Sequence, residues 1–285
     1  LDLAFNKIML GISTITAILA TLLLFLLGAR EKFMAVIKNI RPMKIFYFFL
    51  LFTFGIALSH TWSSNWIDIQ SYILAVLALI FAGMFSICQN DIHDEKIDTV
   101  SNPNRPLISK DLSKSDMEMA SKIFFIFAIL AAYASSHYVL FFTCLMIFIY
   151  FIYSNPPLRL KRFAILNSGL ISLACVSAVL EGFFLVNTDK SIIAFPFSLG
   201  MAIFIFHLAV SNIRDIKDFE GDRVDGIKTI PVLLGLEKSK KVIAGIICFF
   251  YILIPWYFHI SFLFIPSILF AIVSWIFITE KNFIY

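Results

Sequence analysis

The sequence predicts an all-α polytopic membrane protein, a bundle of about nine transmembrane helices around a central cavity. Hydrophobic residues make up 60% of the 285 positions, charged residues only 15%, and the mean hydropathy is +0.90. A water-soluble fold of this length cannot bury so much apolar surface, so lipid is the expected solvent for most of it. The apolar stretches are continuous rather than alternating, which favours helices over an outer-membrane β-barrel.

Nine apolar stretches approach the roughly 20 residues that a membrane span needs. They cover residues 8–28, 43–61, 70–89, 121–136, 138–153, 164–186, 193–211, 242–258 and 260–278. The break at 134–137 is weak, but the length of that region favours two spans joined by a tight turn over one kinked helix. We expect a single domain over 1–285, with a peripheral span at 8–28, a core over 41–235 and two C-terminal spans over 242–278.

The basic residues predict the orientation in the cell membrane. With nine spans and the N-terminus outside, the inner loops hold 21 of the 23 Lys and Arg residues, and only Lys7 and Lys190 fall outside. This partition is what the positive-inside rule predicts for the cytoplasmic side. The net charge of +4 therefore reflects orientation and headgroup contact rather than nucleic-acid binding.

The four cysteines give no support for a zinc or redox site. They lie in four different apolar stretches, and the sequence contains no Cys-x-x-Cys motif. We expect them to be small buried residues.

Two acidic clusters directly follow the third and seventh predicted spans. Each carries three aspartates at i, i+3 and i+7: Asp91, Asp94 and Asp98, then Asp215, Asp218 and Asp222. In a continuous helix this spacing places three carboxylates on one stripe, and Asn90 borders the first stripe. Because each cluster extends the inner end of a span, we expect both triads to face one cavity at the membrane surface.

The acidic clusters predict a magnesium site. Carboxylates along one stripe repel one another, and a hard divalent cation is the usual compensation. Oxygen ligands without a His or Cys pattern favour Mg²⁺, which commonly completes its shell with substrate phosphates and water. The alternative is a pair of solvated inner loops with ordinary salt bridges, but two clusters with identical spacing argue against it. The candidate metal ligands are Asn90 and the six aspartates.

Basic side chains near these clusters fit an anionic phosphate ligand. A proline-containing loop after the first cluster carries Arg105. The loop 155–162 carries three basic residues, of which Lys161 is the preferred anion ligand, although this trio also fits a topology signal alone.

The motifs resemble those of the UbiA superfamily of intramembrane prenyltransferases. Asn90-Asp91-x-x-Asp94-x-x-x-Asp98 and Arg105-Pro106-Leu107 match the NDxxDxxxD and RPL signatures, and Asp218-x-x-x-Asp222 matches the second aspartate signature. Gly226-x-x-Thr229-x-Pro231 is similar to GxxTLP, with Ile230 for Leu. Weaker similarities are Arg41-Pro42 to the family's RP, and Tyr150, Leu160-Lys161-Arg162 and Asn167 to its YxxxLKR…N region.

The resemblance runs from about residue 41 to 235. It departs at the extra N-terminal span and at the C-terminus, where two spans follow the second motif and three would be usual. The Asp215-x-x-Asp218-x-Glu220-Gly221-Asp222 form resembles that of members that make digeranylgeranylglyceryl phosphate, and also that of members that prenylate homogentisate or esterify chlorophyllide.

The resemblance implies Mg²⁺-dependent transfer of a polyprenyl group, geranyl to geranylgeranyl or longer, from its diphosphate to a lipophilic acceptor. The allylic diphosphate would ionise, and the acceptor would be geranylgeranylglyceryl phosphate in ether-lipid synthesis or an aromatic quinone precursor. No nucleic acid and no obligate protein partner is implied.

Roles for individual residues follow from the resemblance together with the chemistry of the side chains. Catalytic roles fall to Asp91, Asp94, Asp218, Asp222 and Tyr150, whose ring face would stabilise an allylic cation. Arg105, Lys161 and Arg214 would bind the leaving diphosphate, and Arg41 and Asn167 would contact the acceptor. We expect Asp98 and Asp215 to support the metal ligands rather than bind metal directly.

Two other classes of membrane protein carry acidic residues in or near their spans. A CDP-alcohol phosphotransferase needs a DGxxAR…GxxxDxxxD run, which the sequence lacks. A cation transporter would favour carboxylates at the bilayer midplane, whereas these aspartates cluster at the predicted inner surface.

Overall fold

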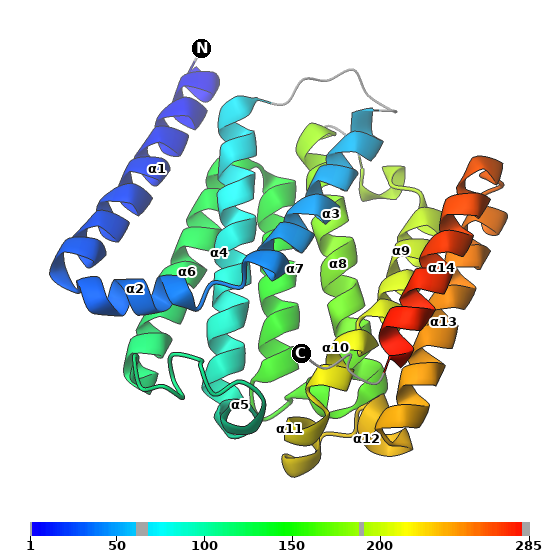
Figure 1. Ribbon diagram of the computed structural model, residues 1–285. Helices are drawn as coiled ribbons and strands as arrows, with labels where there is room; N and C mark the ends of the chain where they lie inside the picture. The colour runs from blue at the N-terminus through cyan, green and yellow to red at the C-terminus, as the bar shows by residue number, and fades with distance from the viewer. Residues whose placement is uncertain (1, 61–67, 188–190, 281–285) are drawn as a thin grey trace. The chain divides into compact units, whose positions relative to one another are not determined.

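The computed structural model describes residues 2–60, 68–187 and 191–280. Within these residues nine helices are long and apolar enough to cross a membrane, which confirms the predicted number (Figure 1). The break in the fourth apolar region is also confirmed, because α6 (Lys114–Ser135) and α7 (His137–Ser154) are separate helices. Residue 61 of the second predicted span, Lys190 and Lys281 lie outside the described residues.

The chain divides into two compact units, which are described separately. The first unit comprises Leu1–Glu95, Pro103–Leu158 and Ala174–Pro196. The second unit comprises Lys96–Asn102, Arg159–Leu173 and Phe197–Tyr285. The single domain expected from the sequence stays a prediction.

The first unit is built on α4. Its other elements are α1 (Asp2–Gly28), α2 (Arg30–Lys38), α3 (Pro42–His60), α6, α7, the second part of α8 (Ala164–Val186) and the short η2 (Ile192–Ala194). Helix α4 (Ile69–His93) packs mainly on α6 and α7. Its fully buried residues Ala75, Ala78 and Ala82 allow these close approaches.

Glycines bring α3 and α8 together in the first unit. A Cβ atom on Gly55 would lie 2.0 Å from the Val179 carbonyl oxygen, and one on Gly182 would lie 1.9 Å from the Phe52 carbonyl oxygen. No side chain fits at these distances, so both backbones meet where glycine leaves room.

The fourth span begins at Lys114, earlier than the predicted residue 121. The reason is a capping box: Ser113 Oγ accepts from the Asp116 backbone N–H over 3.1 Å, and Asp116 Oδ2 accepts from the Ser113 N–H over 3.1 Å. Two orphan amide groups are thereby satisfied at the helix start.

The second unit contains the remaining helices. They are α5 (Glu95–Ser101), η1 (Leu160–Arg162), the first part of α8, α9 (Phe197–Val210), α10 (Asn212–Lys217), α11 (Phe219–Val224), α12 (Ile230–Leu234), α13 (Leu236–Tyr257), η3 (Ser261–Leu263) and α14 (Phe264–Thr279). Figure 1 shows α13 and α14 side by side. Their core includes Ile243, Ala244, Ile247 and Ile278, so apolar packing holds these two spans together.

Candidate active site

Both aspartate motifs are interrupted at their middle aspartate. Helix α4 ends at His93 and α5 begins at Glu95, with Asp94 between them at φ −110° and ψ 16°. Helix α10 ends at Lys217 and α11 begins at Phe219. Asp218 lies between them, with φ −87° and ψ 5°. The expectation of one continuous helical stripe is therefore wrong, because an aspartate favours helix ends over helix interiors. The same break in both copies preserves their equivalence.

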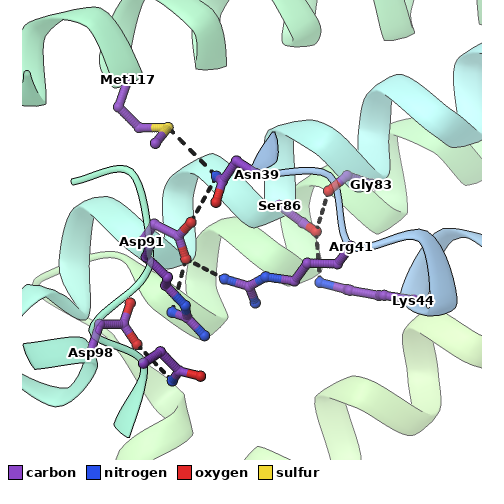
Figure 2. Close-up of polar contacts among 10 residues, drawn as sticks. Asn39, Arg41, Lys44, Gly83, Ser86, Asp91, Asp98 and Met117 are labelled. Carbon is purple, nitrogen blue, oxygen red and sulfur yellow. Dashed lines mark hydrogen bonds and ion pairs between the residues drawn. The ribbon is translucent and has the colours of Figure 1, made fainter. Parts of the chain in front are cut away.

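The first motif places a buried carboxylate among three donors in the first unit (Figure 2). Asp91 is 1% exposed. Its Oδ2 accepts from Asn39 Nδ2 over 2.8 Å, and its Oδ1 accepts from Arg105 Nη1 over 3.0 Å and from Arg41 Nη2. Two guanidinium groups and one amide thus compensate a charge that burial alone would make costly. Asp94 is buried and Asn90 half-buried.

Tyr150 lies on α7 in the same unit, with a cation on its face. The Lys44 ammonium is 4.6 Å from the ring centroid and also donates to Ser86 Oγ over 2.9 Å. The ring face is therefore placed to stabilise positive charge. Sequence reasoning counted Lys44 only as a topology signal and missed Asn39 altogether, since neither residue type at a loop end is specific.

Gln89, directly before the first motif, links the end of α4 to two neighbouring helices. Its Nε2 donates to Ser121 Oγ on α6 over 2.7 Å, and its Oε1 accepts from Asn155 Nδ2 at the end of α7 over 2.8 Å. Three helices are thus joined by neutral hydrogen bonds of a residue two positions before Asp91. This support was also missed, because an amide inside an apolar stretch has no motif of its own.

The second motif lies in the second unit, where Asn167 and Arg214 hold Asp215. Asn167 Nδ2 donates to Asp215 Oδ2 over 2.9 Å, and Arg214 Nη2 donates to Asn167 Oδ1 over 3.1 Å. Asp215 is 2% exposed. Asn167 lies on α8, so this helix contacts the motif directly. Ser168, the next residue on α8, donates to Asn212 Oδ1 at the start of α10 over 2.9 Å.

The surroundings of Asp222 disfavour the ionised form of its side chain. Burial, then the carboxylates of Asp215 and Asp218, raise the pKa of Asp222 to about 7, against the opposing effect of Arg214 and Lys161. The three aspartates of the second motif are thus close enough to repel one another, with two cations near them.

Helix α5 brings the last aspartate of the first motif into the second unit. A Cβ atom on Gly221 would lie 2.4 Å from Ser101 Oγ and 2.7 Å from Ile97 Cγ2, so α5 packs directly on α11. Asp98, on α5, is buried and its Oδ1 accepts from Asn102 Nδ2 over 3.2 Å. The glycine between Asp218 and Asp222 therefore makes this close packing possible.

Two loops of the second unit pair beside the motif. Arg159 Nη2 lies 2.8 Å from Asp225 Oδ2, and the Lys228 N–H donates to the Arg162 carbonyl over 3.2 Å. The Ile227 N–H donates to the Asp222 carbonyl over 2.9 Å. These bonds hold the buried Lys161 in a loop that is tied to the end of the second motif.

The donor set suits a magnesium ion by its chemistry. It consists of carboxylate and amide oxygens, and a divalent cation would relieve the carboxylate repulsion that, after burial, raises the Asp222 pKa. Within the ranges the structure describes, no group of three or more His, Cys, Asp or Glu side chains is already arranged to hold a metal ion. The metal ligands stay a prediction.

Fold and site together define a polytopic membrane helix bundle with two acidic helix–aspartate–helix motifs, with half-buried arginines beside the first and Arg214 and the buried Lys161 near the second. The family model described as "UbiA prenyltransferase family" matches residues 46–284, which is most of the chain. The chain belongs to this family and is an integral membrane protein, as its motifs predict.

Individual relatives are consistent with this assignment. The chain is 27% identical over 201 residues to a digeranylgeranylglyceryl phosphate synthase of Sulfurisphaera tokodaii, covering 69% of each sequence. It is 25% identical over 196 residues to a chloroplastic homogentisate solanesyltransferase of Arabidopsis thaliana, covering 66% of this chain and 50% of that one. The chain thus spans between half and about two thirds of these relatives.

A solved structure shares the fold. It is a UbiA homolog from Archaeoglobus fulgidus bound to GPP and Mg²⁺, with a TM-score of 0.68 at 18% identity, covering 87% of this chain and 88% of that one. The likeness confirms the helix-bundle architecture.

Proposed function

We propose that the chain transfers a polyprenyl group from its diphosphate to a lipophilic acceptor in a Mg²⁺-dependent reaction. The observation that carries the proposal is the cluster in the second unit, where the buried Asp215 accepts from Asn167 and Arg214, and where burial together with the carboxylates of Asp215 and Asp218 raises the pKa of Asp222. Such a cluster suits a metal-bound diphosphate. Family membership supports prenyl transfer over a phosphotransferase or a cation transporter.

The proposed mechanism assigns the leaving group to the basic residues. Mg²⁺ held by Asn90 and the motif aspartates would neutralise charge that develops on the diphosphate as the allylic C1–O bond breaks. Lys161, Arg105 and Arg214 donate charge-assisted hydrogen bonds to the diphosphate, which leaves with the bonding electron pair. The acceptor then forms a bond to C1 and loses a proton, so no covalent enzyme intermediate is needed.

Tyr150 is proposed to act on the allylic group. Its ring already carries the Lys44 ammonium at 4.6 Å from its centroid. Because an aromatic face in an apolar setting attracts positive charge, the same ring suits a developing allylic cation. The surrounding apolar side chains would exclude water from that cation.

The acceptor is proposed to be geranylgeranylglyceryl phosphate or an aromatic quinone precursor. Relatives named for either kind of reaction match the chain at similar identity, 27% and 25%. Arg41 and Asn167 were the predicted acceptor contacts, and both side chains already contact motif aspartates, Asp91 and Asp215. An acceptor that reached either residue would therefore lie beside an aspartate of one of the two motifs.

The proposed orientation places the N-terminus outside and the motif loops at the cytoplasmic surface. It rests on the 21 of 23 Lys and Arg residues that this arrangement assigns to the inner side.

The test is an acceptor panel with purified protein in detergent. Geranylgeranyl diphosphate and Mg²⁺ are supplied with geranylgeranylglyceryl phosphate or with homogentisate, and both diphosphate release and the prenylated product are measured. We expect one product, and none when EDTA removes the metal. Transfer that is unaffected by EDTA, or no transfer to any lipophilic acceptor, would contradict the proposal.

A further inference from the structure

The two oxygens of the Asp91 carboxylate have different kinds of partner. Oδ2 accepts from the neutral amide of Asn39 over 2.8 Å, whereas Oδ1 accepts from the guanidinium groups of Arg105, over 3.0 Å, and Arg41 (Figure 2). Asp91 is 1% exposed, so these side chains rather than solvent determine how the carboxylate interacts.

Neutral and charged donors affect a metal ligand differently. An amide hydrogen bond orients a carboxylate and leaves its charge available to a cation. Two guanidinium groups on one oxygen neutralise that charge and compete directly with a metal ion for the same lone pairs. A metal ion at Oδ1 would therefore have to replace the two guanidinium groups, whereas Oδ2 can keep its neutral amide donor.

Asn39 reaches Asp91 from a segment that precedes the family match at residues 46–284. It follows α2, which Figure 1 shows turning sharply from the end of α1. Lys32 on α2 lies 2.7 Å from Asp116 on α6, and Asn39 Nδ2 also contacts Met117 Sδ at 4.0 Å. The N-terminal segment is thus fixed on α6 in the position from which Asn39 contacts the first motif.

We infer that Asn39 is a positioning residue that fixes Asp91 through Oδ2, while Arg41 and Arg105 occupy Oδ1 until a diphosphate draws them away. A diphosphate offers both guanidinium groups a stronger anionic partner, and the freed oxygen then binds Mg²⁺. Metal and diphosphate therefore bind with positive coupling, each raising the affinity of the other. The inference rests on the proposed function, because it takes the diphosphate as the anion.

The test is Mg²⁺ titration of the full chain in detergent by calorimetry, in an Asp218→Asn, Asp222→Asn background, which removes both proposed metal-binding carboxylates of the second motif so that the first motif is measured. Arg41→Gln and Arg105→Gln keep a polar side chain but remove the competing charge. We expect each to bind Mg²⁺ about tenfold more tightly without diphosphate, which corresponds to the loss of about 1.4 kcal/mol of competition. Lys38→Gln, at an exposed position on α2, is the matched control and should leave the affinity unchanged.

A second Mg²⁺ titration, with inorganic diphosphate present, measures the coupling between metal binding and diphosphate binding. With metal–diphosphate pairing in solution included in the fit, saturating diphosphate should raise the Mg²⁺ affinity of the parent chain at least tenfold. The gain should shrink several-fold in both arginine variants. Arginine variants that bind Mg²⁺ no more tightly than the parent would overturn the exchange.

Asn39 is tested by Asn39→Leu, with Asn39→Ser as a smaller polar variant if the leucine prevents folding. Both should weaken Mg²⁺ binding and raise the Mg²⁺ concentration needed for half-maximal transfer, with kcat little changed at saturating metal. Parental Mg²⁺ affinity in both would overturn the positioning role. Failure here with normal wild-type transfer would leave the proposed function intact, whereas absence of wild-type transfer would remove the function itself.

Discussion

Asn167 on α8 bridges a cation and a carboxylate: its Nδ2 donates to Asp215 Oδ2 over 2.9 Å, and its Oδ1 accepts from Arg214 over 3.1 Å. Because Asp215 is buried, loss of this amide would leave a carboxylate oxygen without its donor, at a cost of about 1–3 kcal/mol. Asn167→Leu should therefore lower the thermal denaturation midpoint in detergent.

Asn167→Asp should lower the thermal denaturation midpoint more than Asn167→Leu does, because it places a second carboxylate beside Asp215. Ile165→Leu, at a highly exposed position on the same helix, is the control and should change the midpoint little. An aspartate variant as stable as the parent would show that the bridge contributes nothing.

Gly221 should not tolerate a larger residue. Its Cβ would lie 2.4 Å from Ser101 Oγ and 2.7 Å from Ile97 Cγ2. Gly221→Ala should therefore displace α5 from α11, costing about 1–3 kcal/mol as an overpacked contact does, and transfer activity should fall with it. Gly169→Ala is the matched control in the second unit, because a Cβ there meets nothing within 4 Å. Equal effects of the two substitutions would contradict the close packing.

Mg²⁺ binding should strengthen as the pH rises through about 7, where the Asp222 pKa lies. The raised pKa means that the metal-free fold favours protonated Asp222. The stability that this proton confers is fully present below the ordinary pKa of 3.8 and is lost as the pH approaches 7. Metal binding requires the carboxylate, so the thermal stabilisation by Mg²⁺ should grow between about pH 6 and pH 8.

Asp222→Asn is the control for this pH dependence, because it removes the titrating group. It should flatten the change in Mg²⁺ stabilisation between the two pH values. The same steep profile in this variant would assign the titration to another residue.

The ion pair between Arg159 and Asp225, 2.8 Å long and largely buried, should matter for diphosphate binding. It holds the loop that carries Lys161, so Arg159→Gln and Asp225→Asn should each raise the KM for the prenyl diphosphate. The double variant should cost less than the sum of the two, because the second change removes a partner already lost. Additive effects in this cycle would mean that the two side chains act separately.

The helical spans and both motifs were predictable from sequence, because apolar length and repeated spacing are local signals. The fourth and fifth spans separated as expected at Ser136, whose Oγ accepts from the Val139 N–H over 3.2 Å. The interruptions at Asp94 and Asp218 were not predicted. Spacing alone assumes a continuous helix, and the preference of aspartate for helix ends outweighed it.

The supports of the site were harder to predict than its motifs. Asn39, Lys44 and Gln89 carry no motif, and each acts through a partner distant in sequence, as Asn39 does through Asp91. Arg41 and Asn167 were predicted as acceptor contacts, which stays a prediction, and the aspartates that they contact in the structure depend on tertiary packing. Sequence spacing cannot supply such pairings.

The most direct test of the central claim compares the wild-type chain with Asp94→Ala and Asp222→Ala. Release of diphosphate from geranylgeranyl diphosphate is measured with Mg²⁺ and the acceptor that the panel identifies, and near-parental denaturation midpoints establish that the variants fold. We expect Mg²⁺-dependent release from the wild type and none from either variant. Full activity in either folded variant would contradict the assignment of the two aspartate motifs as the active site.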